Sequence, residues 1–398
     1  MTLQLNEAWT LILALLAIGL GKAINHRLPW LERGNIPPAV TAGLLLSLVF
    51  AGLRAGGVVD VKLGTAIRDI LLLVFFASLG LGAHFSRLLS AGRGVVVIIL
   101  AITVAILAQN AVGVAVAGAF GDPPALGLFQ GSIAYLGGHG TTVAWAGSSF
   151  AQGLGGALET GIASATLGLV LGGVVAGPVA VWLLTHRTAG ALHETTFAAG
   201  VEVPKSDEPP FSSDRWLRGI LWLAVALGVG PLLNDAAGAQ GWNLPGFLTA
   251  MAVAIVITNA ADALRRPVDT EVTDLIGNVA LRVFLAITLL SLDWMSLADR
   301  LLMVAAGAAA QVTVTVAVAL LLVYPLLGRD RDAAVASAGF IGFGLGAMPV
   351  GMAVMNRLIQ RFGEAPRAML VITLGATLYQ DTANALILTA LFRWLGAG

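Results

Sequence analysis

Apolar residues lie along this chain in long runs that short polar segments separate. Most runs hold roughly 17 to 27 positions, and at about 1.5 Å per residue a helix of that length crosses a hydrocarbon core about 30 Å thick. The pattern predicts an all-α integral membrane protein with ten spanning helices. These are expected at 9–21, 38–53, 67–83, 94–119, 161–184, 216–233, 247–261, 275–292, 301–327 and 368–394.

The composition indicates that the bilayer is the solvent for this chain. Of its 398 residues, 58% are hydrophobic and 11% are charged, whereas a soluble domain carries about 25% charged residues. The absence of cysteine excludes disulfides and thiolate metal sites. The formal net charge is zero, so nothing suggests a nucleic acid as partner.

The distribution of Lys and Arg predicts the orientation, because loops on the cytoplasmic side carry the excess of positive charge. One alternating set of loops contains Lys22, Arg27, Arg33, Arg87, Arg93, Arg187, Lys205, Arg215, Arg218, Arg265, Arg266, Arg329, Arg331, Arg357, Arg361 and Arg367. The other set contains Arg54, Lys62, Arg68, Arg300 and Arg393. We therefore expect both termini outside and the central loop in the cytoplasm.

The polar segment 185–215 divides the chain into two halves with five predicted spans each. An odd number of spans forces the second half, 216–398, to enter the membrane upside down relative to the first half, 1–184. This arrangement is the inverted-topology repeat that is common among secondary transporters. The sequence thus predicts two inverted repeats joined by a cytoplasmic linker.

Each half carries a glycine-rich stretch between its fourth and fifth spans, at 131–145 and at 339–353. Glycine costs a helix about 1 kcal/mol and proline about 3 kcal/mol, so neither stretch favours a continuous helix. We expect re-entrant, broken-helix loops at about 127–150 and about 333–356. Such paired interruptions indicate a binding site near the middle of the membrane, although small residues also allow close packing between helices.

With these motifs the chain resembles the bacterial glutamate:sodium symporter family. The similarity includes Gly-Gly-His-Gly-Thr at 137–141, Gly-Phe-Gly-Leu-Gly-Ala at 342–347, and segments at 36–40, 68–69, 75–80, 109–110, 131–133, 169–173, 277–279, 332–335, 361–363, 381 and 384–386. The resemblance implies sodium-coupled import of glutamate or a related small anionic amino acid, Na⁺ as the coupling ion and no organic cofactor. It further implies a homodimer in the bacterial inner membrane that works by elevator-type alternating access.

Two features depart from the family pattern. The chain has Met348, Pro349 and Val350 where members of the family tend to carry Thr-Pro-Thr, and Arg282 where they tend to carry a small hydroxyl residue. Both departures fall where solute or ion would bind. A different organic anion, such as a dicarboxylate or a 2-hydroxy acid, and coupling to protons therefore stay as alternatives.

Candidate substrate ligands come from the two glycine-rich stretches and from the eighth span. Hydroxyls, backbone N–H groups and the positive end of a helix dipole suit a carboxylate, and an arginine grips one with two hydrogen bonds. His139 has a packing role as its alternative. The candidates are Ser132, His139, Gly140, Thr141, Thr142, Arg282, Gly346, Ala347 and Met348.

Sodium prefers hard oxygen ligands, and Asp381 lies well inside a predicted span, where a charge costs at least about 2.5 kcal/mol. In one interpretation Asp381 and Arg282 neutralise each other, or the Arg282 side chain snorkels to the membrane interface. In the other, Arg282 binds substrate while Asp381 and neighbouring oxygens bind sodium. The sodium candidates are Asp381, Asn384, Asn110, Gly137 and Gly344, with Gln109, Gln311 and Asn278 as weaker ones.

Other classes of function have less support. A membrane hydrolase with Ser132, His139 and Asp381 as its catalytic residues lacks the Gly-x-Ser-x-Gly elbow and the His-Glu-x-x-His metal motif. A channel is expected to have a carbonyl filter or rings of charge, and neither pattern is visible. We therefore expect a transporter rather than an enzyme.

Overall fold

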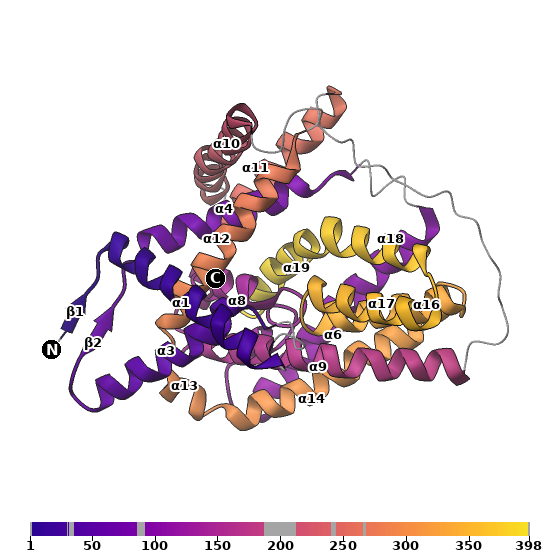
Figure 1. Ribbon diagram of the computed structural model, residues 1–398, viewed down its shortest axis with the longest axis horizontal. Coiled ribbons are helices and arrows are strands. Elements are labelled where there is room, and N and C mark those ends of the chain that lie inside the picture. Colours follow the sequence, from indigo (N-terminus) through magenta and orange to yellow (C-terminus); the bar gives the residue numbers. More distant parts are fainter. Residues whose placement is uncertain are drawn as a thin grey trace.

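The computed structural model describes residues 2–29, 31, 36–85, 92–186, 212–239, 244–265 and 268–396 (Figure 1). Over these residues the chain is helical apart from one pair of three-residue strands. Eight helices in these ranges are long and apolar enough to cross a membrane. The all-helical membrane architecture predicted from the sequence is confirmed to that extent.

The first half begins with a short parallel strand pair in which Thr2 lies opposite Asp60. Its long helices are separated by short helical pieces in the glycine-rich region. The elements are β1 (Thr2–Gln4), α1 (Glu7–Arg27), α3 (Pro38–Ala55), β2 (Asp60–Lys62), α4 (Ala66–Gly82), α6 (Gly92–Ala119), α7 (Pro124–Gly127), η1 (Leu128–Gln130), α8 (Gly138–Ala146), η2 (Ser149–Ala151) and α9 (Ala157–His186).

The second half has the same alternation of long and short helices. Its elements are α10 (Ser213–Gly238), α11 (Gly246–Ala263), α12 (Thr270–Leu290), α13 (Trp294–Ala298), α14 (Leu301–Val318), η3 (Ala319–Val323), α15 (Tyr324–Leu326), α16 (Arg331–Leu345), α17 (Met348–Phe362), α18 (Pro366–Gly375), η4 (Ala376–Gln380) and α19 (Asp381–Trp394). The segments η3 and η4 are π-helical, so they hold one extra residue within an otherwise regular helix.

The predicted spans differ from these helices mainly at their ends. Helix α9 reaches His186 and α10 begins at Ser213, so both helices extend into the segment that the sequence assigned to the linker. The remainder of that linker, 187–211, lies outside the described residues. The third predicted span is the 17-residue α4, and the tenth runs through α18, η4 and α19.

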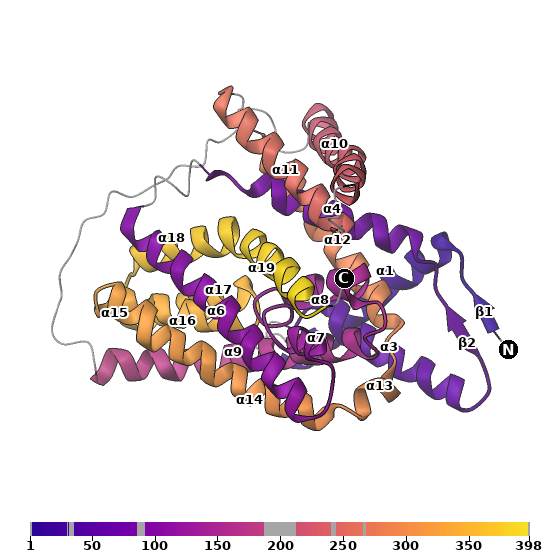
Figure 2. The ribbon, with the colours of Figure 1, turned by 180° about the vertical axis from the view of Figure 1, so that it is seen from behind.

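The helices pack in two groups, and each half of the chain contributes to both (Figures 1 and 2). The first helix group contains α1, α3 and α4 with α10, α11 and α12. The second helix group contains α6, α8 and α9 with α14 and α16 to α19. The first three long helices of each half thus lie in one group, and the later helices of each half lie in the other.

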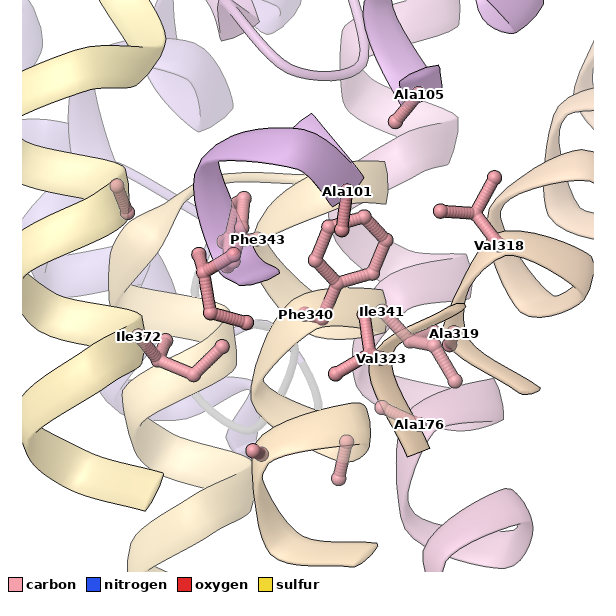
Figure 3. Packing of buried hydrophobic residues seen from close by; sticks show 14 of the residues in the cluster. Ala101, Ala105, Ala176, Val318, Ala319, Val323, Phe340, Ile341, Phe343 and Ile372 are labelled. Atoms are coloured by element: carbon pink, nitrogen blue, oxygen red, sulfur yellow. The ribbon is translucent and has the colours of Figure 1, made fainter. Parts of the chain in front are cut away.

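The second helix group has a continuous apolar core around α16. Phe340 and Phe343 pack there against α6, α14 and α18, as Figure 3 shows with Ala101, Val318 and Ile372. Phe340 and Phe343 are both fully buried, with ring centroids 5.2 Å apart. Helix α16 is therefore held on all sides, even though its 15 residues are too few to cross the bilayer.

The contact between the two helix groups includes α8, which packs against α12, and a cluster of aromatic rings. Trp145 at the end of α8 lies 5.7 Å from Phe247 of α11 and 5.1 Å from Phe392 of α19, measured between ring centroids. Phe247 in turn lies 4.5 Å from Phe76 of α4. Trp145 thus joins rings of both helix groups.

Candidate functional site

The first glycine-rich stretch breaks the helical backbone over residues 131–137, which we call the first break. Helix-like structure ends at Gln130, and α8 begins at Gly138, whose φ of +69° favours glycine. A side chain on Gly131 would place its Cβ 2.5 Å from Asn110 Oδ1, so only glycine fits there. The prediction that this stretch is not a continuous helix is confirmed.

The second glycine-rich stretch is interrupted at residues 346–347, which we call the second break. Helix α16 ends at Leu345, Ala347 is extended, and α17 begins at Met348 with Pro349 in its first turn. Proline suits that position because its missing N–H would have no helical partner. The predicted interruption is thus present in this half as well.

The second break rests on α9 through glycines. A Cβ on Gly168 would collide with the Leu345 carbonyl oxygen, and one on Gly172 would lie 3.0 Å from Gly342 O. Because no side chains intervene at these positions, the backbones of α9 and α16 lie close together. The glycines of α9 therefore fix how deeply α16 is seated.

The two breaks lie next to each other. A Cβ built on Gly138 would lie 3.5 Å from the carbonyl oxygen of Gly346. Neither Gly137 before α8 nor Ala347 before α17 provides a side-chain cap for the helix that follows. Two helix N-termini without a side-chain cap therefore lie close to this point, and their dipoles favour an anion. Part of their N–H groups is already used, because Gly138 N donates to Ala134 O and Val350 N donates to Ala347 O.

A buried cluster of polar side chains adjoins the first break; we call Asn110, Ser132 and Asn384 the amide centre. Asn110 Nδ2 donates to Ser132 Oγ at 2.8 Å, and Ser132 Oγ donates to Asn384 Oδ1 at 2.6 Å. Ser132 N also donates to Asn110 Oδ1 at 3.1 Å, and Asn384 Nδ2 donates to Ser132 O at 3.2 Å. The amide centre thus joins α6, the first break and α19.

Asp381 lies one turn before Asn384 and directly follows η4. Gln380, directly before Asp381, donates from Nε2 to Leu136 O at 2.6 Å. Asn384, one turn after Asp381, also hydrogen-bonds to the first break. Gln380 Oε1 is buried and has no hydrogen-bond partner among the described residues. The Asp381 carboxylate, the Gln380 amide oxygen and nearby backbone carbonyls are the oxygen types that a sodium ion prefers.

Glutamine side chains that the sequence left as minor candidates connect the two breaks. Gln109 Nε2 donates to Gly344 O at 2.7 Å and to Thr315 Oγ1 at 3.0 Å. Gln311 Nε2 donates to the backbone oxygens of Gln109 and Gln130, both at 2.8 Å. The predicted sodium ligand Gly344 therefore already accepts a hydrogen bond from α6.

The other predicted ligands of the first stretch lie on α8. His139 Nε2 is 3.0 Å from the hydroxyl of Thr166, which already donates to Ile162 O, so the imidazole donates and is tied to α9. Thr142 Oγ1 donates to Gly138 O at 2.9 Å. Thr141 is buried. His139 thus connects α8 to α9, whereas the Thr142 hydroxyl bonds within α8 itself.

Gly140 of α8 faces the first helix group, and Arg282 of α12 belongs to that group. A Cβ on Gly140 would lie 3.0 Å from Leu281 Cδ1 and 3.1 Å from Phe75 Cε1, so α8 fits closely between α12 and α4. Arg282, next to Leu281, is exposed and makes no ion pair with Asp381. The interpretation in which Arg282 and Asp381 neutralise each other directly is wrong for this conformation.

Sequence reasoning missed the roles of Gln130, Gln380 and Thr166. Gln130 directly precedes the first break and Gln380 directly precedes Asp381. An uncharged amide inside an apolar run is a weak signal, because such residues also serve as hydrogen-bond partners between helices. Their positions beside stronger candidates could have marked Gln130 and Gln380, whereas Thr166 carries no such signal.

These features define the class of protein: a multispanning helical membrane protein in which two broken helices meet at a buried polar centre. A family model described as sodium/glutamate symporter matches residues 3–364. The chain is 33% identical over 392 residues to the sodium/glutamate symporter of Escherichia coli strain K12, covering 97% of each chain. It is 34% identical over 395 residues to that of Haemophilus influenzae, covering 96% of each.

The chain belongs to the sodium/glutamate symporter family. The resemblance inferred from the sequence motifs is thereby confirmed. The named relatives are transporters, so the protein is a transporter and not an enzyme.

Proposed function

We propose that the protein imports glutamate together with sodium, with the substrate carboxylate held where the two breaks meet. The observation that supports this most directly is the proximity of Gly138 and Gly346, which brings together the N-termini of α8 and α17. Backbone N–H groups there bind a carboxylate without a buried fixed charge. Because a net charge is costly inside the membrane, each bound anion then requires a cation bound nearby.

Sodium supplies that cation in this proposal, with Asp381 as its charged ligand. The candidate ligands around Asp381 are the oxygens of Gln380, Asn384 and the carbonyls of the first break, because Gln380 and Asn384 both hydrogen-bond to that break. Sodium lowers the electrostatic cost of an anion nearby, so each ligand binds more tightly in the presence of the other. This reciprocity is the physical basis of symport.

In this proposal Arg282 binds the second carboxylate of the substrate. It extends from α12 in the first helix group, next to Leu281, which contacts α8. An exposed guanidinium in the middle of a spanning helix is costly unless it meets water or an anion. Exchange of Arg282 for Lys is expected to raise the KM for glutamate, because the charge stays and the bidentate geometry is lost.

The transport movement proposed is of the elevator type. The second helix group carries both breaks and the amide centre, and it moves as one body past the first helix group. The supporting feature is the division of each half into the same two groups. We propose in addition that the halves are inverted repeats with re-entrant breaks, that the termini lie outside, and that the first helix group forms a homodimer.

The departures from the family pattern bear on which anion is carried. Val350 is fully buried, with its Cγ1 3.9 Å from the Cβ position of Gly173, so this lost hydroxyl faces α9 rather than the cargo. Of the two positions where this chain lacks a threonine of the family pattern, Met348, at the start of α17, is the one that remains near the proposed substrate site. The loss of this hydroxyl favours a different organic anion, such as a dicarboxylate or a 2-hydroxy acid, as the second candidate.

Uptake into proteoliposomes tests the proposal. Labelled glutamate is compared with other mono- and dicarboxylates, each with and without an inward sodium gradient and with a proton gradient as the control. We expect glutamate uptake that requires sodium. Preference for another anion would support the second candidate, and uptake driven by protons alone would refute sodium coupling.

A further inference from the structure

A groove with a volume of about 590 Å³ lies on the outside of the second helix group, between α9 and α17. Its lining is mostly apolar or glycine from the C-terminal half of α9, and its α17 side carries two arginines. The volume lies within the range of sites that hold small organic ligands. The groove is separate from the amide centre and from the proposed substrate site.

Glycine and proline form the floor of this groove. A Cβ on Gly177 would meet no atom within 4 Å, and one on Gly173 would meet only Val350, at 3.9 Å. Packing within the protein therefore does not require glycine at Gly177. Trp182, one turn beyond Pro178, is 41% exposed, so this face of α9 is open toward the membrane.

Positive charge gathers at one end of the groove. Arg357 and Arg361 are four residues apart on α17, so they lie on the same face of the helix, and both are exposed. Arg357 donates to Ala353 O at 3.3 Å, and Arg361 lies over the ring of Phe362 at 5.1 Å. Neither arginine has a carboxylate partner among the described residues, and no acidic side chain lines the groove.

The depth of these arginines follows from the helix geometry. If the second break lies at the bilayer midplane, Arg357 and Arg361 lie about 15 Å and about 21 Å from it, at about 1.5 Å per residue. Half of the hydrocarbon core is about 15 Å. The guanidinium groups then reach the phosphate level of the cytoplasmic leaflet, whose lipids are rich in negative charge. This step rests on the proposed function, because it takes the midplane position of the break from there.

We propose that the groove binds an anionic phospholipid, with an acyl chain along Gly173, Gly177 and Pro178 and the phosphate on Arg357 and Arg361. The apolar floor matches the chain, and two guanidinium groups without a carboxylate partner among the described residues match the phosphate. Because α17 begins at the second break, the bound lipid contacts the same helix that positions the substrate. A lipid that prefers one position of α17 shifts the balance between transport states.

Native mass spectrometry of the purified full chain in detergent, titrated with phosphatidylglycerol, tests the site without substrate or sodium. Its result is therefore independent of whether the proposed function holds. In the double variant R357Q/R361Q we expect phosphatidylglycerol affinity to fall roughly 10- to 30-fold. Gly177→Leu keeps both charges and fills the floor, and we expect a similar loss. Arg27→Gln removes an exposed arginine from the last turn of α1, away from the groove, and serves as the matched control.

The outcomes separate lipid from other occupants. Loss in both groove variants, with affinity unchanged in Arg27→Gln and no competition by inorganic phosphate, supports the proposal. Full affinity in either groove variant overturns it. Equal competition by inorganic phosphate also overturns it, because the site then recognises the headgroup charge without the acyl chain.

Discussion

Gly168→Ala is the sharpest perturbation of the proposed substrate site that avoids its polar residues. The added methyl would collide with the Leu345 carbonyl oxygen and come within 3.0 Å of the Tyr135 ring. Backbone cannot rotate away as a side chain can, so α16 must shift at the second break. Gly228→Ala makes the same exchange inside α10, where a Cβ meets nothing within 4 Å.

The magnitude follows from the difference between these two variants. Each gains about 1 kcal/mol of helix propensity from replacing glycine by alanine, and this gain cancels in the comparison. Overpacking costs about 1 to 3 kcal/mol and applies only at Gly168. We therefore expect Gly168→Ala to be about 1 to 3 kcal/mol less stable than Gly228→Ala, with lower glutamate uptake.

Reversible unfolding in detergent measures the stability difference, and proteoliposome uptake measures the functional one. If the two variants have equal stability and equal uptake, the close contact between α9 and α16 does not exist in the protein. If stability falls but uptake per folded molecule is unchanged, the contact exists but does not position the site. Either result would refute the reasoning that connects Gly168 to transport.

Three further predictions concern polar groups. Ser132→Ala leaves amide partners unpaired in the amide centre and is expected to cost about 1 to 3 kcal/mol in unfolding free energy; additivity with Asn384→Ala in a double-mutant cycle would contradict the coupling. Asp381→Asn is expected to raise the sodium concentration for half-maximal uptake roughly tenfold or more, with less change in the KM for glutamate; unchanged sodium activation would contradict its role. Hydrogen bonds from Arg215 hold the pKa of Asp269 below its usual range. The pair therefore stabilises the fold fully above about pH 4, the pKa of an unfolded Asp. This stabilisation is lost as the pH falls through the lowered pKa of the folded state. Thermal unfolding below pH 4 is therefore expected to be less pH-dependent in Asp269→Asn.

The hydrophobic pattern predicted helix positions well because each spanning helix must satisfy its own backbone hydrogen bonds in lipid. The breaks were also predictable, because glycine and proline weaken a helix whatever surrounds it. Predicted ends were less accurate where a helix continues into polar sequence. Ser213, for example, begins α10 within the segment assigned to the linker.

The partners of individual site residues could not be predicted from the sequence. Asn110 and Asn384 were assigned to sodium and Ser132 to substrate, yet the three side chains form one hydrogen-bonded cluster. Their sequence separations of 22 and 252 residues give no information about contact in space. The direct pairing considered for Arg282 and Asp381 also depended on packing between helix groups, which periodicity within one helix does not reveal.

The π-helical segment η4 determines the direction in which α19 presents its side chains. One additional residue in a helix advances all later positions by about 100° around the axis. Gln380 now contacts Leu136, and Asn384 contacts Ser132. Without the extra residue, Asp381 and Asn384 would be rotated away from this part of the first break. One extra residue in the helix is thus enough to bring Asn384 to the first break, with Asp381 one turn before it.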